Sequence, residues 1–279
     1  MARRTSFDQI LTYIVLVAGG LLMIMPFYWL ISTSFKTIKN IYIYPIQWFP
    51  DPIRWQNYTE LFEQVPVLLY TRNTLIITFF NTIGVLFSAS LAGYSFARLR
   101  FKGRDLMFSV LLSTIMVPFA VTMIPLYVMF SRLGWVGTFL PLIVPPFFGA
   151  PINTFMLRQF FRTIPMELED AARIDGASRP RIFVQIMLPL AKPALTVTAI
   201  QSFLYGWNAF LQPLIYLKKN KLWTLALGVN SLGMFMPGVP DTTHFQMALA
   251  TIMVLPPVIL YFVAQRAFVR GIVLTGLKG

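Results

Sequence analysis

The chain has 279 residues, 23 basic and 10 acidic side chains, one histidine and no cysteine, and its mean hydropathy is +0.68. Hydrophobic residues make up 57% and charged residues 12%, against roughly 45–50% and about 25% in soluble globular proteins. This composition excludes a disulfide scaffold, a cysteine-based metal or redox site and a disordered chain, and it predicts an all-α polytopic membrane protein.

Long uncharged runs divide the chain, and six of them are long enough to cross a bilayer as a helix of about 20 residues. A further uncharged run, 222–240, contains five glycines and prolines, which would leave backbone groups unsatisfied in lipid. We therefore expect an external loop there. The sequence predicts a single transmembrane domain over 1–279 with six helices, at about 10–35, 73–97, 106–131, 137–158, 190–217 and 244–266.

Basic residues predict the orientation of these helices. Segments 1–8, 98–105, 158–181 and 266–279 hold 14 Lys and Arg among 54 residues, whereas the segments on the other side hold 8 among 62. Because cytoplasmic loops carry the excess of Lys and Arg, we expect both termini in the cytoplasm. The net charge of +13 then reflects topology and contact with the anionic lipid bilayer, and no nucleic-acid partner is expected.

The motifs of several function classes are missing from the sequence. It has no P-loop, so we expect no ATP on this chain, and its single His244 argues against a metal site. No acid lies inside a predicted span, whereas ion-coupled pumps keep such costly buried carboxylates. No acid–base pair for an enzyme is evident. These absences favour a transporter that catalyses nothing, binds no cofactor and takes its energy from elsewhere.

The charged segment between the fourth and fifth spans predicts a short helix at about 165–177. Pro165 suits its first turn and Gly176 its C-terminal stop, while Glu169 and Arg173 are spaced to pair at i, i+4. Its apolar face is narrow and consists mostly of small residues. Such a helix is too short to be stable alone, so it either docks into another protein or lies on the membrane as an amphipathic connector.

The same segment resembles the EAA loop of ABC importer permeases. Asp170-Ala171-Ala172 stands at Glu-Ala-Ala, with Asp in place of the first Glu; Gly176 follows at the family's spacing, and Ile186, Leu188 and Pro189 complete the pattern. The stretch 207–211 and the tail 276–279 also resemble the smaller, six-span permease of carbohydrate-uptake importers.

This resemblance implies a type I ABC importer permease that carries a sugar or sugar-like solute in the cytoplasmic membrane of a bacterium or archaeon. It implies a second permease, favouring a different chain, two ATP-binding subunits that hold the ATP and Mg, and an extracytoplasmic solute-binding protein. The predicted loop helix would be the coupling helix that sits in a cleft of the ATPase. The coupling residues that it assigns are Glu169, Asp170, Ala171, Ala172, Arg173, Asp175, Gly176 and Ala177.

Four polar residues of the fifth predicted span, spaced +4, +3 and +4, fall on one helix face. They are Gln201, Tyr205, Asn208 and Gln212, with Ser202 beside them. Amides and a phenol can donate and accept hydrogen bonds, which suits a hydroxyl-rich solute, so these four side chains are the expected solute pathway. The alternative is that they bridge neighbouring helices. Asn153 and Thr154 of the fourth span are weaker candidates.

Two other functions stay open from the sequence. A self-sufficient secondary transporter would need two repeats or a midplane ion site, and no internal repeat is evident. A structural subunit of a membrane complex would have no solute contacts, so replacing the polar residues of the fifth span would leave transport unchanged.

Overall fold

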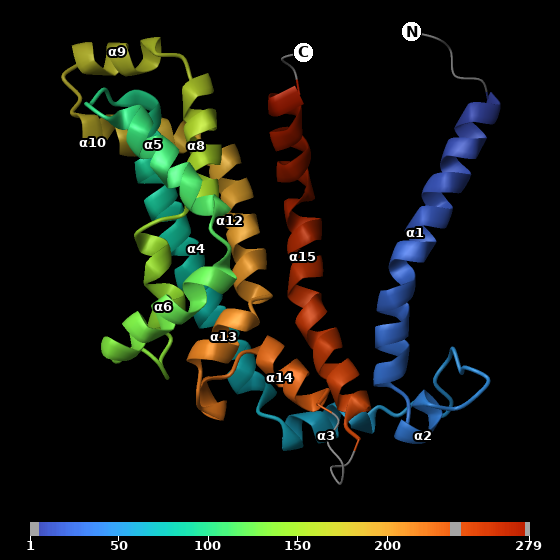
Figure 1. Ribbon diagram of the computed structural model, residues 1–279. Helices are drawn as coiled ribbons and strands as arrows, with labels where there is room; N and C mark the ends of the chain where they lie inside the picture. The colour runs from blue at the N-terminus through green and yellow to red at the C-terminus, as the bar shows by residue number, and fades with distance from the viewer. Residues whose placement is uncertain (1–5, 235–240, 277–279) are drawn as a thin grey trace. The chain divides into compact units, whose positions relative to one another are not determined.

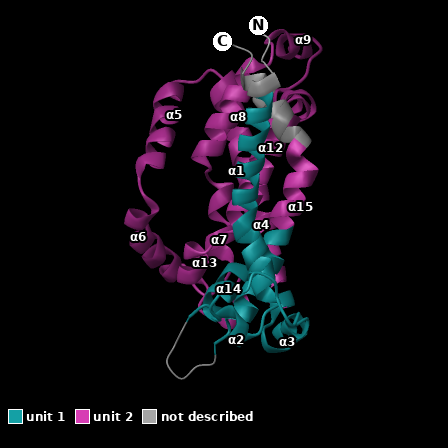
Figure 2. Cartoon of the chain, turned by 90° about the vertical axis from the view of Figure 1, so that its right-hand side faces the viewer, with its two compact units in different colours: residues 1–68, 225–255 teal, residues 69–224, 256–279 magenta. Residues whose placement is uncertain are grey.

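The computed structural model describes residues 6–234 and 241–276, and all the regular structure in these ranges is helical (Figure 1). The prediction of an all-α chain is therefore confirmed. The chain divides into two compact units, one from residues 1–68 and 225–255 and the other from residues 69–224 and 256–279 (Figure 2).

Four to six segments of the described chain are long and apolar enough to cross a membrane. Four are single helical segments: Gln9–Ser34, Val67–Arg98, Leu140–Thr163 and Thr243–Gln265. Two more arise if each sharply bent pair is one span, namely Arg104–Met116 with Phe119–Arg132, bent by 100°, and Arg179–Leu190 with Lys192–Trp207, bent by 77°. The helices are those of a membrane protein, and the number six stays a prediction.

Prolines account for both bends. Pro118 precedes the second half of the first pair with an extended backbone, φ −62° and ψ 141°, and it has no N–H to continue a helix. Pro189 and Pro193 flank the second bend at Ala191. The first bend therefore lies inside the span predicted at 106–131, and the second lies at the start of the span predicted at 190–217.

The unit of residues 1–68 and 225–255 contains α1 (Ser6–Ser34), α2 (Ile38–Ile41), α3 (Gln56–Gln64), α14 (Leu225–Leu232) and the first turns of α15 (Thr243–Gly276). Its connecting segment is tied together by the buried Asn57, whose amide donates to the carbonyls of Ser34 and Lys36 at 2.8 and 2.9 Å. Within the segment 222–240, predicted as an external loop, the structure forms the eight-residue α14, whose first four residues are buried. The helix is too short to cross a bilayer.

The other unit holds the elements that form the candidate site. They are α4 (Val67–Arg98, from residue 69), α5 (Arg104–Ser113), α6 (Phe119–Arg132), α7 (Leu140–Ile143), α8 (Pro151–Thr163), α9 (Glu167–Ile174), α10 (Arg179–Ile182), α11 (Leu188–Leu190), α12 (Lys192–Trp207) and α13 (Leu211–Tyr216). A π-helical turn, Phe183–Met187, joins α10 to α11.

The core of this unit lies where α4, α8 and the 182–191 segment meet, around Ala89, Leu157, Phe161, Ile182 and Met187. Helices α4 and α8 approach closely at Gly93, where an added Cβ would lie 3.1 Å from both the Arg158 amide nitrogen and the Leu157 Cβ. Small residues allow such close backbone contact between membrane helices. Helix α9 lies across the end of the unit at which α8 ends (Figure 1).

Candidate functional site

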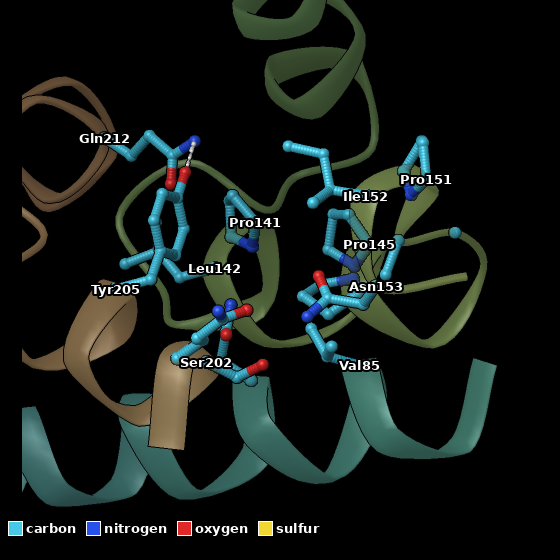
Figure 3. Close-up of a pocket in the computed structure, with 15 residues that line it drawn as sticks. Val85, Pro141, Leu142, Pro145, Pro151, Ile152, Asn153, Ser202, Tyr205 and Gln212 are labelled. Atoms are coloured by element: carbon cyan, nitrogen blue, oxygen red, sulfur yellow. Dashed lines mark hydrogen bonds between the residues drawn. The ribbon is translucent and has the colours of Figure 1, made fainter. Parts of the chain in front are cut away.

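A cavity of about 510 Å³ lies within the larger unit, between α4, the segment of α7 and α8, and the segment of α12 and α13 (Figure 3). Its wall is mostly proline and aliphatic side chains. Six polar residues complete it: Asn81, Asn153, Gln201, Ser202, Tyr205 and Gln212.

Prolines shape one side of this cavity. Pro141, Pro145, Pro146 and Pro151 cut the chain into α7, a 3-10 turn over Pro145–Phe147 and α8, because proline cannot continue a hydrogen-bonded helix. All four prolines line the cavity. The hydroxyl of Ser88 on α4 donates to the carbonyl of Pro146 at 2.7 Å and so fastens this irregular wall to α4.

The opposite side contains three of the four polar residues predicted in the fifth span. Gln201 and Tyr205 come from α12 and Gln212 from α13, and the Gln212 amide donates to the Tyr205 hydroxyl at 3.2 Å (Figure 3). Asn208 is absent from the lining. Helix α12 ends at Trp207, so Asn208 is its C-cap, and its amide donates to the carbonyl of Leu204 at 2.8 Å. The prediction that these four polar residues share one helix face is therefore wrong.

Sequence reasoning missed Asn81, which lies on α4 and lines the cavity. The residue is 9% exposed, and its Oδ1 atom is buried with no hydrogen-bond partner in the part of the chain that the structure describes. Buried polar atoms are nearly always hydrogen-bonded, so this unpaired acceptor in a residue of the cavity wall makes Asn81 a candidate for the site. The feature of the sequence that could have indicated this residue is the presence of an asparagine within the uncharged run 73–97.

The cavity lining contains no Lys, Arg, His, Asp or Glu. Its polar groups are amides and hydroxyls, which donate and accept hydrogen bonds without compensating a charge. The wall thus matches a neutral solute with several hydroxyl groups better than an anion. Across residues 6–234 and 241–276, no group of three or more acidic or histidine side chains is placed to hold a metal ion.

The predicted loop helix is α9, Glu167–Ile174, which is shorter than the range 165–177. It begins after Pro165, with Met166 as N-cap, so Pro165 lies outside its first turn. At the other end, Gly176 has φ +79°, and the amides of Gly176 and Ala177 bond to the carbonyls of Arg173 and Ala172 at 3.0 and 2.9 Å. This is a Schellman C-terminus, which glycine adopts without strain.

Two faces of α9 differ sharply in exposure. Glu169 and Ala172 are buried against the unit. The outer face exposes apolar and acidic side chains together with the end of the helix. Its members are Leu168, Asp170, Ala171, Ile174, Asp175 and Gly176, and Ile174 alone is 86% exposed. Of the apolar face expected from the sequence, only Ala172 turns inward.

The buried face of α9 carries an ion pair that the sequence did not predict. Arg98, the last residue of α4, places its Nε 3.2 Å from Oε1 of Glu169, and both side chains are almost completely shielded from solvent. Arg173, which is half exposed, lies 3.4 Å from the other carboxylate oxygen, as the i, i+4 spacing suggested. Arg173 lies four residues from Glu169 and Arg98 lies far from it in the sequence. Only the contact with Arg173 could therefore be predicted from sequence spacing.

Comparisons with known proteins agree with this architecture. The family described as "Binding-protein-dependent transport system inner membrane component" matches residues 84–274. A chain in the crystal structure of a bacterial ABC transporter involved in the import of the acidic polysaccharide alginate has a similar fold, with a TM-score of 0.82, 95% of this chain and 99% of that chain covered, and 20% identity. That likeness concerns the fold.

Several curated relatives match over nearly their whole length. The sn-glycerol-3-phosphate transport system permease protein UgpE of Yersinia pestis is 32% identical over 271 residues, covering 95% of this chain and 96% of the relative. The arabinooligosaccharides transport system permease protein AraQ of Bacillus subtilis is 33% identical, with 93% and 92% covered. The lactose transport system permease protein LacG of Rhizobium radiobacter is also 33% identical, with 96% of both covered.

Proposed function

Because the chain belongs to the family of binding-protein-dependent transport system inner membrane components, we propose that it forms half of the pathway by which a sugar or sugar-like solute enters the cell. The chain is a membrane-embedded permease component, and its family is one of transport proteins rather than enzymes. The proposal adds the nature of the solute, the partners and the means of coupling.

The observation that carries the solute assignment is the cavity with six polar but uncharged lining residues. Relatives of similar identity are named for lactose, arabinooligosaccharides and sn-glycerol-3-phosphate. A buried phosphate would need cationic or strongly donating partners, and this lining has no cationic side chain. The neutral oligosaccharides are therefore the better match.

The outer face of α9 supports the proposed coupling role. Its exposed leucine, alanine and isoleucine form a small apolar patch beside Asp170 and Asp175, which docking into a cleft of a partner would remove from water. Of the predicted coupling residues, we assign those that are not buried to contact with an ATP-hydrolysing subunit, namely Asp170, Ala171, Arg173, Asp175, Gly176 and Ala177. Glu169 and Ala172, which are buried against the unit, would support the helix from within. ATP and Mg would be held by that subunit.

The complete importer would contain this chain, a second and different permease, two ATP-binding subunits and an extracytoplasmic solute-binding protein. Both termini of this chain would lie in the cytoplasm, on the same side as α9, as the distribution of Lys and Arg favours. ATP binding would then switch the cavity between outward and inward access, provided that the solute and the ATPase favour different states.

Uptake assays in cells that express the whole system test the solute assignment. Labelled lactose, an arabinooligosaccharide and sn-glycerol-3-phosphate are compared with and without this chain. We expect chain-dependent uptake of a neutral oligosaccharide and loss of that uptake when ATP is depleted. Chain-dependent uptake of sn-glycerol-3-phosphate alone would contradict the neutral class, and uptake that persists without ATP would favour a secondary transporter.

A further inference from the structure

The buried end of α4 carries a charge-based link to α9. We propose that the ion pair between Arg98 and Glu169 positions α9 against α4 and α8, and that it transmits movement of α9 to the cavity wall. The inference rests on the proposed coupling role of α9, and it concerns residues that touch neither the solute nor the ATPase.

Burial makes this pair unusual. The side chain of Glu169 is 0% exposed and that of Arg98 is 3% exposed, with 3.2 Å between Nε and Oε1. Removing two charges from water is expensive, and well-packed apolar side chains often stabilise a fold equally well. A buried ion pair instead specifies which side chain each charge must contact and how the two side chains are oriented, because leaving either charge unpaired is strongly unfavourable.

Arg98 also holds the segment that leads into α9. Its guanidinium donates to the carbonyls of Phe161 and Ile164, at the C-terminus of α8, and contacts the sulfur of Met166, the N-cap of α9. Arginine can do this because its planar head carries five donors. One side chain of α4 thereby ties together the end of α8, the connector and α9.

Helix α4 joins this link to the cavity. It is unbroken from Asn81, which lines the cavity, to Arg98, a separation of 17 residues or about 25 Å at the rise of an α-helix. Between these two points Gly93 brings α4 into close contact with α8. A displacement of α9 would therefore move the ends of two helices that form the cavity.

The surface partner of Glu169 has a different role. Arg173 contacts both Glu169 and Asp170, at 3.4 and 3.2 Å, from a half-exposed position on α9 itself. Because all three residues lie on one helix, these contacts cannot link α9 to another element. The positioning function falls to Arg98.

The test uses the whole importer, purified through a tag on this chain and reconstituted in liposomes. Glu169→Gln keeps the shape and one acceptor but removes the charge, and Arg98→Lys keeps the charge but loses the fork of donors. Glu167→Gln is the matched control, because Glu167 is an exposed acid of the same helix with no ion pair among the described residues. The readouts are co-purified ATPase and solute imported per ATP hydrolysed.

We expect both variants to retain the ATPase and to import about 2- to 30-fold less solute per ATP, the range seen for residues that modulate coupling, while the control matches the unmodified chain. Unchanged transport per ATP in both variants would overturn the inference, and so would loss of the assembled complex in both, which would make the pair a folding element only. Failure of the unmodified chain to retain an ATPase would instead refute the proposed function.

Discussion

The side-chain amide of Gln212 on α13 donates a 3.2 Å hydrogen bond to the hydroxyl of Tyr205 on α12, across the break that separates the two helices. Both side chains line the cavity, whereas Asn208, at the break itself, does not. The break therefore determines which polar groups can reach a solute.

Replacement of Gln212 tests this arrangement. We expect Gln212→Ala to raise the solute concentration for half-maximal uptake by about 2- to 12-fold, which corresponds to the loss of one net hydrogen bond. Asn208→Ala should have a smaller effect, because its amide bonds to its own helix. A larger effect of Asn208→Ala than of Gln212→Ala would restore the continuous polar face expected from the sequence and contradict the structure.

Asn81 offers a second test of the cavity. Because its buried Oδ1 has no hydrogen-bond partner among the described residues, Asn81→Leu should leave the midpoint of thermal unfolding nearly unchanged and lower uptake several-fold. Asn73, on the same helix, is the matched comparison, since its amide donates to the carbonyls of Lys221 and Trp223 at 3.0 and 2.9 Å. Asn73→Leu should destabilise the chain by about 1–3 kcal/mol. Equal loss of stability in both variants would indicate a structural role for Asn81.

Gly176 tests the assigned docking surface. Gly176→Asp should abolish uptake while the amount of chain in the membrane stays unchanged, because the exposed end of α9 would carry a new charge and a strained backbone at φ +79°. Gly103, at φ +80° and likewise with open space around its Cβ position, is the control for the strain. Normal uptake in Gly176→Asp, or an equal loss in Gly103→Asp, would contradict the coupling assignment.

The hydrogen bonds of Asp241 predict that the stability of the start of α15 depends on pH. Its carboxylate accepts hydrogen bonds from the amide and hydroxyl of Thr243 at 2.8 and 2.6 Å, and these bonds hold the pKa of Asp241 below its ordinary value of 3.8. Because the pKa is lower in the folded than in the unfolded state, the ionised carboxylate stabilises the helix start at any pH above its ordinary pKa. This stabilisation is lost as the pH falls through the lowered pKa.

Hydrogen exchange of the first turn of α15 measures this dependence. Protection should be constant at neutral pH and should fall in acid, beginning near pH 4. Asp241→Asn should flatten the acid dependence, and Asp241→Ala should weaken the helix start at every pH by about 0.5–2 kcal/mol, as for a lost N-terminal cap. The same acid-induced loss in Asp241→Asn would assign the effect to another group.

The parts of the fold that the sequence predicted are those set by local chemistry. Uncharged runs mark the apolar helices, and the chain stops α9 at a glycine that the structure places at positive φ. Sequence spacing also anticipated the contact between Glu169 and Arg173, which are neighbours on one helix.

The parts that the sequence did not predict depend on contacts between distant segments. Periodicity assumed that the fifth span is one helix, and it could not locate the break after Trp207. Glycines and prolines in 222–240 suggested a loop, although burial of Leu225–Gly228 stabilises α14. Arg98 was counted as a loop charge, and only the fold brings it to Glu169.

The most direct test of the central claim is reconstitution of the affinity-purified complex in proteoliposomes with ATP on the ATPase side and solute-loaded binding protein on the other. We predict that a P-loop ATPase and a second permease co-purify with this chain, and that a neutral oligosaccharide accumulates only when ATP is hydrolysed. A chain that purifies alone and moves solute without ATP would contradict the account.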